Sequence, residues 1–193
     1  VKKTVNQILK YNKQVCVMQC NTNYTNSLKN FENINLNVLR SYKKFFKEKI
    51  ILGLSDHTPG NVSVLGAVAL GAKIIEKHFT DDNDRYGPDH KFSMNFSTWK
   101  EMVDQTRILE KTMGDGIKKI EKNEKQSVIV QRRGAWLTKD VKKNDNLTKD
   151  KIIFLRPCPR NSIDIFDINK FIGRKFRYNM SKNSLITKKC LMK

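Results

Sequence analysis

The chain of 193 residues is long enough for one large or two small domains with a hydrophobic core, and its formal net charge is +19. This charge alone would suggest nucleic acid or an anionic surface as a partner, but the lysines are scattered among asparagines, without clustered arginines and interleaved aromatic residues. We therefore expect no nucleic-acid partner, and no membrane partner because no apolar run approaches the length of a membrane span. The four cysteines form no CxxC pair, which favours reduced thiols in the cytoplasm.

The first part of the chain predicts a helix, a strand and a second, longer helix. Residues 1–12 place apolar side chains at helical spacing, and residues 14–19 form a short apolar run that favours a strand. A polar loop over residues 20–26 follows at the carboxyl end of that strand, where ligands collect in parallel α/β folds. Residues 28–47 then have the apolar periodicity of one amphipathic helix that packs on a sheet.

The stretch over residues 53–94 contains all three histidines, five of the nine glycines and the densest run of acidic residues. Residues 50–54 and 72–77 predict two strands, joined by a turn and a short helix. Such a crossover makes the two strands parallel and adjacent, so His57 and His78 should meet at the carboxyl edge of the sheet.

Side chains alternate along a strand, so Ser55 lies on the same face as His57, and Glu76 on the same face as His78. If both faces point inward, two imidazoles, a hydroxyl and a carboxylate line one pocket. Neutral imidazoles beside a carboxylate, with room for water, can hold a divalent metal. The alternative is structural: one histidine caps a loop and the other packs in a core.

An acidic loop over residues 81–89 follows His78, and a Gly-Pro pair within it favours a fixed turn that presents Asp89. Arg85 in this loop is expected to pair with the adjacent aspartates. The next helix should open at Ser97 or Thr98, because Thr98 and Glu101 have the spacing of a capping box.

The composition changes after residue 114. Residues 115–126 are lysine-rich with few apolar positions, which is typical of a linker. Short strand-like pieces between turns then predict a small, mostly β domain over residues 127–193, with strands at 127–130, 134–137, 151–155 and 185–187 and one short helix near 167–171.

Several motifs, in order and at matching spacing, resemble the sialic acid synthase family across residues 14–193. In the first part these are residues 53–58, 65–72, 76–80, 84–90 and 92–94. The second part resembles the antifreeze-like, or SAF, domain that ends these enzymes, through residues 133–136, 138–145, 156–157 and 172–175.

The resemblance implies an α/β fold: the C-terminal portion of a TIM barrel, about three β/α units, over residues 1–114, the linker, and the SAF domain. Laid against the family, the sequence begins near the helix before the sixth strand. The first five units and their phosphoenolpyruvate-binding lysines then have no counterpart. We therefore expect a partial or truncated copy that has no synthase activity alone.

The resemblance also implies the reaction, which joins phosphoenolpyruvate to an N-acetylhexosamine such as N-acetylmannosamine and gives a nine-carbon 2-keto sugar acid and phosphate. It implies a divalent ion (Mn, Mg or Co) and a domain-swapped homodimer. The residue roles that follow are metal binding by His57 and His78, catalysis by Glu76 and His78, phosphoenolpyruvate binding by Ser55 and Thr22, and sugar positioning by Asp89, Tyr24 and, from the partner subunit, Arg156.

Other interpretations stay open. The acceptor could be that of a legionaminate, pseudaminate or spore-coat sugar synthase. A non-catalytic anion- or carbohydrate-binding module would need neither His57 nor His78. Two departures from the family pattern affect the site: Thr25 replaces a proline in the first loop, and Cys158, Pro159 and Arg160 replace glycines after Arg156. An ordinary surface arginine is the alternative for Arg156.

Overall fold

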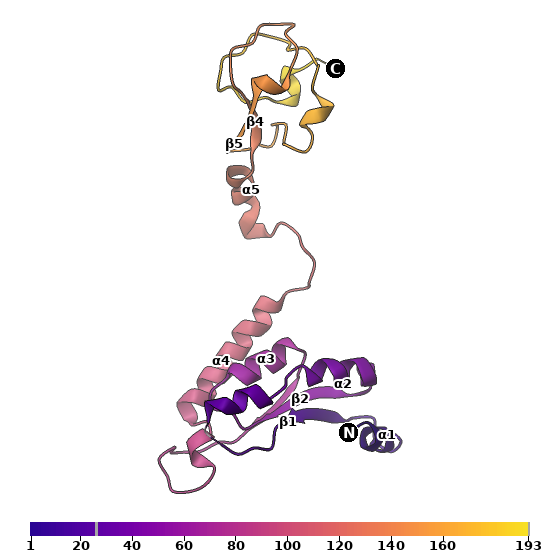
Figure 1. The fold of residues 1–193 in the computed structure, drawn as a ribbon, viewed down its shortest axis with the longest axis vertical. Coiled ribbons are helices and arrows are strands. Elements are labelled where there is room, and N and C mark those ends of the chain that lie inside the picture. The colour runs from indigo at the N-terminus through magenta and orange to yellow at the C-terminus, as the bar shows by residue number, and fades with distance from the viewer. Residues whose placement is uncertain (26, 193) are drawn as a thin grey trace. The chain divides into compact units, whose positions relative to one another are not determined.

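The computed structural model describes residues 1–25 and 27–192. Asn26 of the predicted first loop and Lys193 at the end of the predicted second domain lie outside the described residues. The chain divides into two compact units, Val1–Ile117 and Lys118–Lys193 (Figure 1). Across the described residues, no helix has the length and apolar character needed to cross a membrane.

The first unit contains a three-stranded parallel sheet in the order β1-β2-β3. The strands are β1 (Cys16–Cys20), β2 (Ile51–Asp56) and β3 (Ile74–Lys77). The helices are α1 (Lys2–Ile8), α2 (Val38–Phe46), α3 (Val62–Ala69) and α4 (Phe96–Met113), and α3 and α4 lie side by side next to the sheet (Figure 1). The predicted parallel order of strand, helix and strand is confirmed.

The two faces of this sheet differ, because alternate residues of each strand point to opposite sides. Leu52 and Leu54 of β2 pack with side chains from α2, α3 and α4 in a buried core. The opposite face, which we call the open face, carries the other alternate residues of the strands. On this face Ile51 of β2 is 43% exposed and Ile74 of β3 is 39% exposed. Gly53 lies at the centre of the open face, where a Cβ would come within 2.8 Å of Met18 Cγ and 2.9 Å of the Ile74 carbonyl oxygen.

The predicted single helix over residues 28–47 is wrong. The structure has a 3₁₀ segment over Leu28–Asn33 and a separate helix, α2. Between them Asn35 has a φ of 50°, a left-handed conformation that asparagine tolerates and that a right-handed helix cannot continue through.

The start of α4 also differs from its prediction. The capping box is formed by Asn95 and Thr98, not by Thr98 and Glu101. The Asn95 side chain accepts from the Thr98 backbone N–H at 3.0 Å, and Thr98 Oγ1 accepts from the Asn95 N–H at 2.9 Å. The asparagine is the better cap because its extended backbone lies just before the first helical residue.

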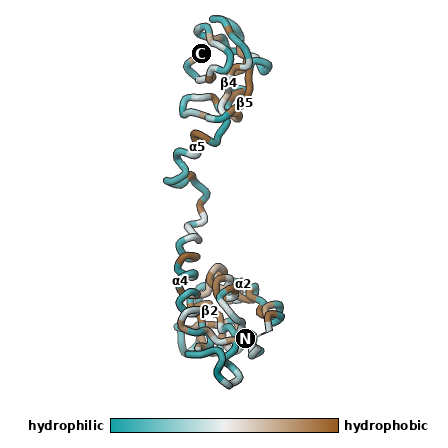
Figure 2. The backbone as a smooth tube through the Cα atoms, turned by 90° about the vertical axis from the view of Figure 1, so that its left-hand side faces the viewer, coloured by the Kyte–Doolittle hydropathy of each residue, from teal (hydrophilic) through white to brown (hydrophobic). Residues whose placement is uncertain are grey.

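The second unit contains α5 (Lys125–Gln131) and an antiparallel pair, β4 (Gly134–Leu137) with β5 (Ile152–Leu155). Figure 2 shows hydrophobic residues along α5 and β5 and hydrophilic residues in the loops. Isolated bridges, including Trp136 with Leu185, join the remaining segments around a core of nine buried residues: Ala135, Leu137, Val141, Leu147, Ile163, Ile168, Phe176, Ile186 and Leu191.

Two predictions for the second unit need correction. Residues 127–130, predicted as a strand, lie in α5, and no residue of that helix is buried. The β-branched run therefore has no sheet to join, and the preceding Glu121–Glu124 capping box starts helical structure instead. The piece at residues 185–187 forms isolated bridges, and the predicted short helix is a 3₁₀ turn over Ile168–Lys170.

Candidate functional site

Two imidazoles meet at the carboxyl edge of the parallel sheet. His57 directly follows β2 and His78 directly follows β3, one position beyond the registered pair Asp56 and Lys77. Their ring centroids are 5.0 Å apart, with the ring planes inclined at 64°. The expectation that the two histidines converge is confirmed, and it follows from adjacent parallel strands that end at the same level.

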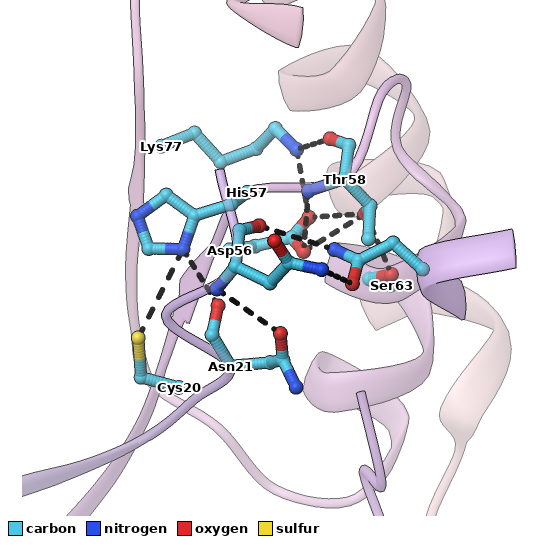
Figure 3. Close-up of polar contacts among 9 residues, drawn as sticks. Cys20, Asn21, Asp56, His57, Thr58, Ser63 and Lys77 are labelled. Carbon is cyan, nitrogen blue, oxygen red and sulfur yellow. Dashed lines mark hydrogen bonds and ion pairs between the residues drawn. The ribbon is translucent and has the colours of Figure 1, made fainter. Parts of the chain in front are cut away.

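The orientation of His57 is set by the loop after β1. Its Nδ1 lies 2.9 Å from the Asn21 carbonyl oxygen and 3.9 Å from Cys20 Sγ (Figure 3). A carbonyl oxygen can only accept a hydrogen bond, so Nδ1 carries the proton and the lone pair of a neutral ring lies on Nε2. The His57 residue is only 3% exposed.

His78 has an acidic neighbour in the loop after β3. Its Nδ1 lies 3.6 Å from Asp89 Oδ2, and the two side chains are 26% and 46% exposed. Asp89 of the acidic loop therefore lies beside His78. A carboxylate on the Nδ1 side of this ring favours the tautomer that leaves Nε2 as the acceptor.

Aromatic rings cover the two histidines. The Tyr24 ring centroid is 4.3 Å from that of His57 and 5.6 Å from that of His78. Phe92, which is 3% exposed, lies 6.2 Å and 5.1 Å from the same two rings. Tyr24 is 54% exposed, so it covers the imidazoles on the solvent side, and Phe92 closes the buried side.

The structure also brings Ser55 and Glu76 together. Their backbones are registered across β2 and β3, and the Ser55 hydroxyl donates to Glu76 Oε1 at 3.4 Å. Both side chains lie on the open face. Thr22 is exposed in the loop next to Asn21, and the structure gives it no contact with the histidines within the described residues.

Arg156 belongs to the second unit. Its Nε donates to the Gln131 carbonyl oxygen at 2.7 Å, which orients the exposed guanidinium. It lines a surface pocket of that unit with other polar and apolar residues: Gln131, Arg132, Arg133, Asp164, Ile165 and Phe166.

The acidic loop is held by its own contacts. Arg85 Nη1 lies 2.8 Å and 3.0 Å from the two carboxylate oxygens of Asp81. This hydrogen-bonded pair lowers the pKa of Asp81 and raises the pKa of Arg85, and it confirms the predicted pairing within the loop. His90 Nδ1 lies 2.7 Å from Thr80 Oγ1, so the third histidine braces the loop.

Sequence reasoning missed a buried ion pair on the other face of the sheet. Lys77 Nζ lies 2.7 Å from Asp56 Oδ2 and 2.6 Å from the Thr58 carbonyl oxygen (Figure 3). A signal was present, because each of the two charged residues is the last of its strand and directly precedes a histidine. Asp56 is two residues from Leu54, and Lys77 is two residues from Ile75, so each points to the same face as that apolar residue. Both charged side chains therefore point into the core and away from the histidines.

The residues present fit a divalent metal ion in part. The described residues contain no cluster of three or more histidine, cysteine or acidic side chains arranged as ligands. The two imidazoles nonetheless show the pattern of metal-binding histidines, with a carbonyl or carboxylate oxygen on the Nδ1 side and Nε2 directed elsewhere. Two nitrogen ligands would leave coordination positions for water and substrate oxygens.

Fold and site together define an α/β unit with two imidazoles at the carboxyl edge of a parallel sheet, and a second, small β-rich unit. The chain belongs to the NeuB family, which it matches over residues 1–118, and residues 132–192 match the SAF domain. The resemblance noted in the sequence is confirmed.

The relatives that the chain matches include proteins named as sugar acid synthases. The chain is 37% identical over 172 residues to N,N'-diacetyllegionaminic acid synthase of Campylobacter jejuni, covering 89% of this chain and 49% of that protein. It is 36% identical over 119 residues to N-acetylneuraminate-9-phosphate synthase of Homo sapiens, covering 61% and 32%. The chain spans about half the length of the legionaminic acid synthases that it matches.

The fold is also similar to those of solved structures. N-acetylneuraminic acid synthetase of Leptospira borgpetersenii superposes with a TM-score of 0.55 at 29% identity, covering 65% of this chain and 43% of that one. A Chromobacterium violaceum protein described as spore coat polysaccharide biosynthesis protein E has a TM-score of 0.69 at 21% identity, covering 100% and 56%. The second likeness concerns the fold alone.

Proposed function

We propose that this chain forms the C-terminal part of a synthase that condenses phosphoenolpyruvate with an N-acetylated amino sugar to a nine-carbon 2-keto sugar acid and phosphate. The juxtaposition of His57 and His78 carries this proposal. The relatives named for legionaminic, pseudaminic and N-acetylneuraminic acids support the substrate class. N-acetylmannosamine is the first acceptor to test, and the legionaminate and pseudaminate precursors are the alternatives.

The histidines would hold the divalent ion, manganese, magnesium or cobalt, through Nε2. When bound there, the ion polarises an aldehyde oxygen of the sugar. The part played by the protein would be to hold the two imidazole rings at a fixed separation with Nε2 free to bind. The Asn21 carbonyl oxygen does this for His57, and the Asp89 carboxylate does it for His78.

Glu76 and Ser55 would serve the reacting groups beside the histidines. The Ser55 hydroxyl already donates to Glu76 Oε1, so the second carboxylate oxygen remains available to accept a proton from water or a sugar hydroxyl. Ser55 and Thr22 would bind phosphoenolpyruvate. His78 would be the second catalytic residue, beside Glu76. The support for Thr22 is its position in the loop that also orients His57.

The sugar would bind between the aromatic cover and the acidic loop. Asp89 can accept hydrogen bonds from sugar hydroxyls, and the exposed Tyr24 ring offers an apolar surface to the sugar ring. Arg156 of a partner subunit would complete this site in a domain-swapped homodimer. Its exposure and its orientation by Gln131 support that role. The four free thiols fit the cytoplasm.

The first unit is proposed to be part of a TIM barrel. Its three parallel strands carry helices on one face, and the open face exposes the apolar Ile51 and Ile74. Strands supplied by further polypeptide would cover that face and contribute the phosphoenolpyruvate-binding lysines. The 193-residue chain alone is therefore expected to release no phosphate from phosphoenolpyruvate and N-acetylmannosamine. Measured phosphate release would contradict this expectation.

A Mn²⁺ titration of the chain tests the site directly. His57→Ala and His78→Ala are each expected to weaken Mn²⁺ binding at least about tenfold, because each removes one of two nitrogen ligands. His90→Ala is the matched control, since His90 contacts Thr80 in the acidic loop and is expected to weaken Mn²⁺ binding less than loss of either of the other histidines. Equal affinity in all three variants would contradict the proposed site and favour a non-catalytic sugar- or anion-binding module.

A further inference from the structure

The buried ion pair between Lys77 and Asp56 lies on the face of the sheet opposite to the histidines. Its two side chains are 1% and 0% exposed, and they continue the side-chain rows of Leu54 and Ile75 toward α3. Burying two charges costs free energy that an apolar pair would not cost. A fold that needed only core packing at this point would be served as well by apolar residues.

One ammonium group holds both residues that flank His57. Lys77 Nζ donates to Asp56 Oδ2 at 2.7 Å and to the Thr58 carbonyl oxygen at 2.6 Å, so the backbone on either side of His57 is tied to one point (Figure 3). Lys77 is itself the residue before His78. The ion pair is therefore the last link between β2 and β3 before the two imidazoles.

The Asp56 carboxylate extends this clamp to the next helix. It accepts from the Thr58 backbone N–H at 3.1 Å and from the Thr58 hydroxyl at 2.8 Å. The single hydroxyl proton of Thr58 is thus used, so Ser63 Oγ, 2.9 Å away, is the donor to Thr58 Oγ1. Ser63 lies in the first turn of α3, and the strand end, the turn and the helix form one network.

We infer that Lys77 and Asp56 are positioning residues that set the separation and orientation of the His57 and His78 rings. Neither residue touches an imidazole, and both act through the main chain of the neighbouring position. A consequence is that they also set the affinity of the histidine pair for a divalent ion. The expected effect on metal affinity rests on the proposed function. The positioning of the two rings does not depend on it.

The effect of the ion pair on the histidine rings can be measured separately from its effect on the stability of the fold. Replacing both charges together leaves no unpaired buried charge, so the fold of Asp56→Asn/Lys77→Met is expected to survive. Methionine cannot donate to the Thr58 carbonyl oxygen, so the backbone around His57 loses its tie to β3. The matched control is Leu52→Ala, which removes a buried side chain of the same strand that has no part in the network.

The experiment is NMR on the metal-free 193-residue chain, whose three histidines can be assigned by substitution. The nuclear Overhauser effect between the His57 and His78 ring protons is expected in the wild type and in Leu52→Ala, and is expected to be lost in folded Asp56→Asn/Lys77→Met. Lys77→Arg, which keeps a charged donor, is expected to retain it. An unchanged effect in the folded double variant overturns the inference.

Addition of Mn²⁺ to the same samples tests the proposed metal site separately. In the wild type, the ion is expected to broaden the His57 and His78 signals. The double variant is expected to bind Mn²⁺ at least about tenfold more weakly. Absence of broadening in the wild type would reject the metal site, while the metal-free ring contact would still decide the positioning role.

Discussion

The candidate residues of the two units differ in how their side chains are held in place. His57 and His78 are carried by adjacent parallel strands and held from behind by the buried Lys77 and Asp56 pair. Arg156 lies in an irregular exposed segment, oriented by one hydrogen bond to Gln131. The two imidazoles are brought together within one unit, whereas the proposed role of Arg156 requires the surface of a partner subunit. Substitutions should therefore affect folding strongly near the first site and weakly near the second.

The largest effect is expected for Lys77→Ala. It leaves Asp56 buried without its counter-charge, so the first unit should lose about 3–5 kcal/mol of unfolding free energy. Urea denaturation followed by Trp99 fluorescence in a Trp136→Phe background measures this, since the two tryptophans lie in different units. Lys139→Ala, followed by Trp136 fluorescence in a Trp99→Phe background, removes the exposed partner of Asp150 and should have a much smaller effect on the second unit. Equal stability of both variants would remove the distinction drawn between the two regions.

A smaller effect is expected for Gly53→Ala in the centre of β2. The new Cβ would lie 2.9 Å from the Ile74 carbonyl oxygen, which is backbone and cannot move freely. Overpacking of this kind costs about 1–3 kcal/mol and should push β2 and β3 apart. The same urea denaturation measures it, with Ser55→Ala on the same face as the control. Stability equal to that of the control would mean that the strands can adjust at no cost.

A still smaller effect is expected for Arg156→Ala. The variant loses one exposed hydrogen bond to Gln131, which is worth less than about 1 kcal/mol to the second unit. Unfolding of that unit, followed by Trp136 fluorescence in a Trp99→Phe background, tests this. A loss comparable to that of Lys77→Ala would show that Arg156 supports the fold itself, and it would weaken the case for a role in a partner's site.

The last prediction concerns exposed carboxylates in both units and involves protonation only. The Lys139 hydrogen bond lowers the pKa of Asp150 to about 2, and the Arg85 hydrogen bond lowers the pKa of Asp81. A lowered pKa in the folded state contributes stability above the unfolded pKa, about 3.9, and this is lost as the pH falls through the folded value. Carboxyl NMR titration should show both shifts, and Lys139→Met should raise the pKa of Asp150 alone. A pKa of Asp150 unchanged in Lys139→Met would contradict the assigned cause.

The parallel strands and the convergence of His57 with His78 could be predicted because they follow from local patterns and a general rule. Short β-branched runs separated by a helix imply parallel neighbours, and alternation then assigns each side chain to a face. The pairing of Ser55 with Glu76 follows from the same rule and is also observed.

Other features could not be predicted because they depend on competition between local and tertiary contacts. The left-handed Asn35 interrupts a strong helical pattern, and the β-branched residues of α5 find no strand to pair with. The contact of Lys77 with the Thr58 carbonyl oxygen depends on the path of a turn, which no spacing in the sequence encodes.

The acceptor that orients His57 is a main-chain oxygen, that of Asn21. Every amino acid has this atom, so exchange of the side chain at position 21 cannot delete it. The tautomer of the His57 ring is instead determined by the backbone conformation of the loop, which places this oxygen beside Nδ1. Related chains could differ at this position and still hold the imidazole in the same way, and a search for invariant positions would pass over the group that aligns the ring.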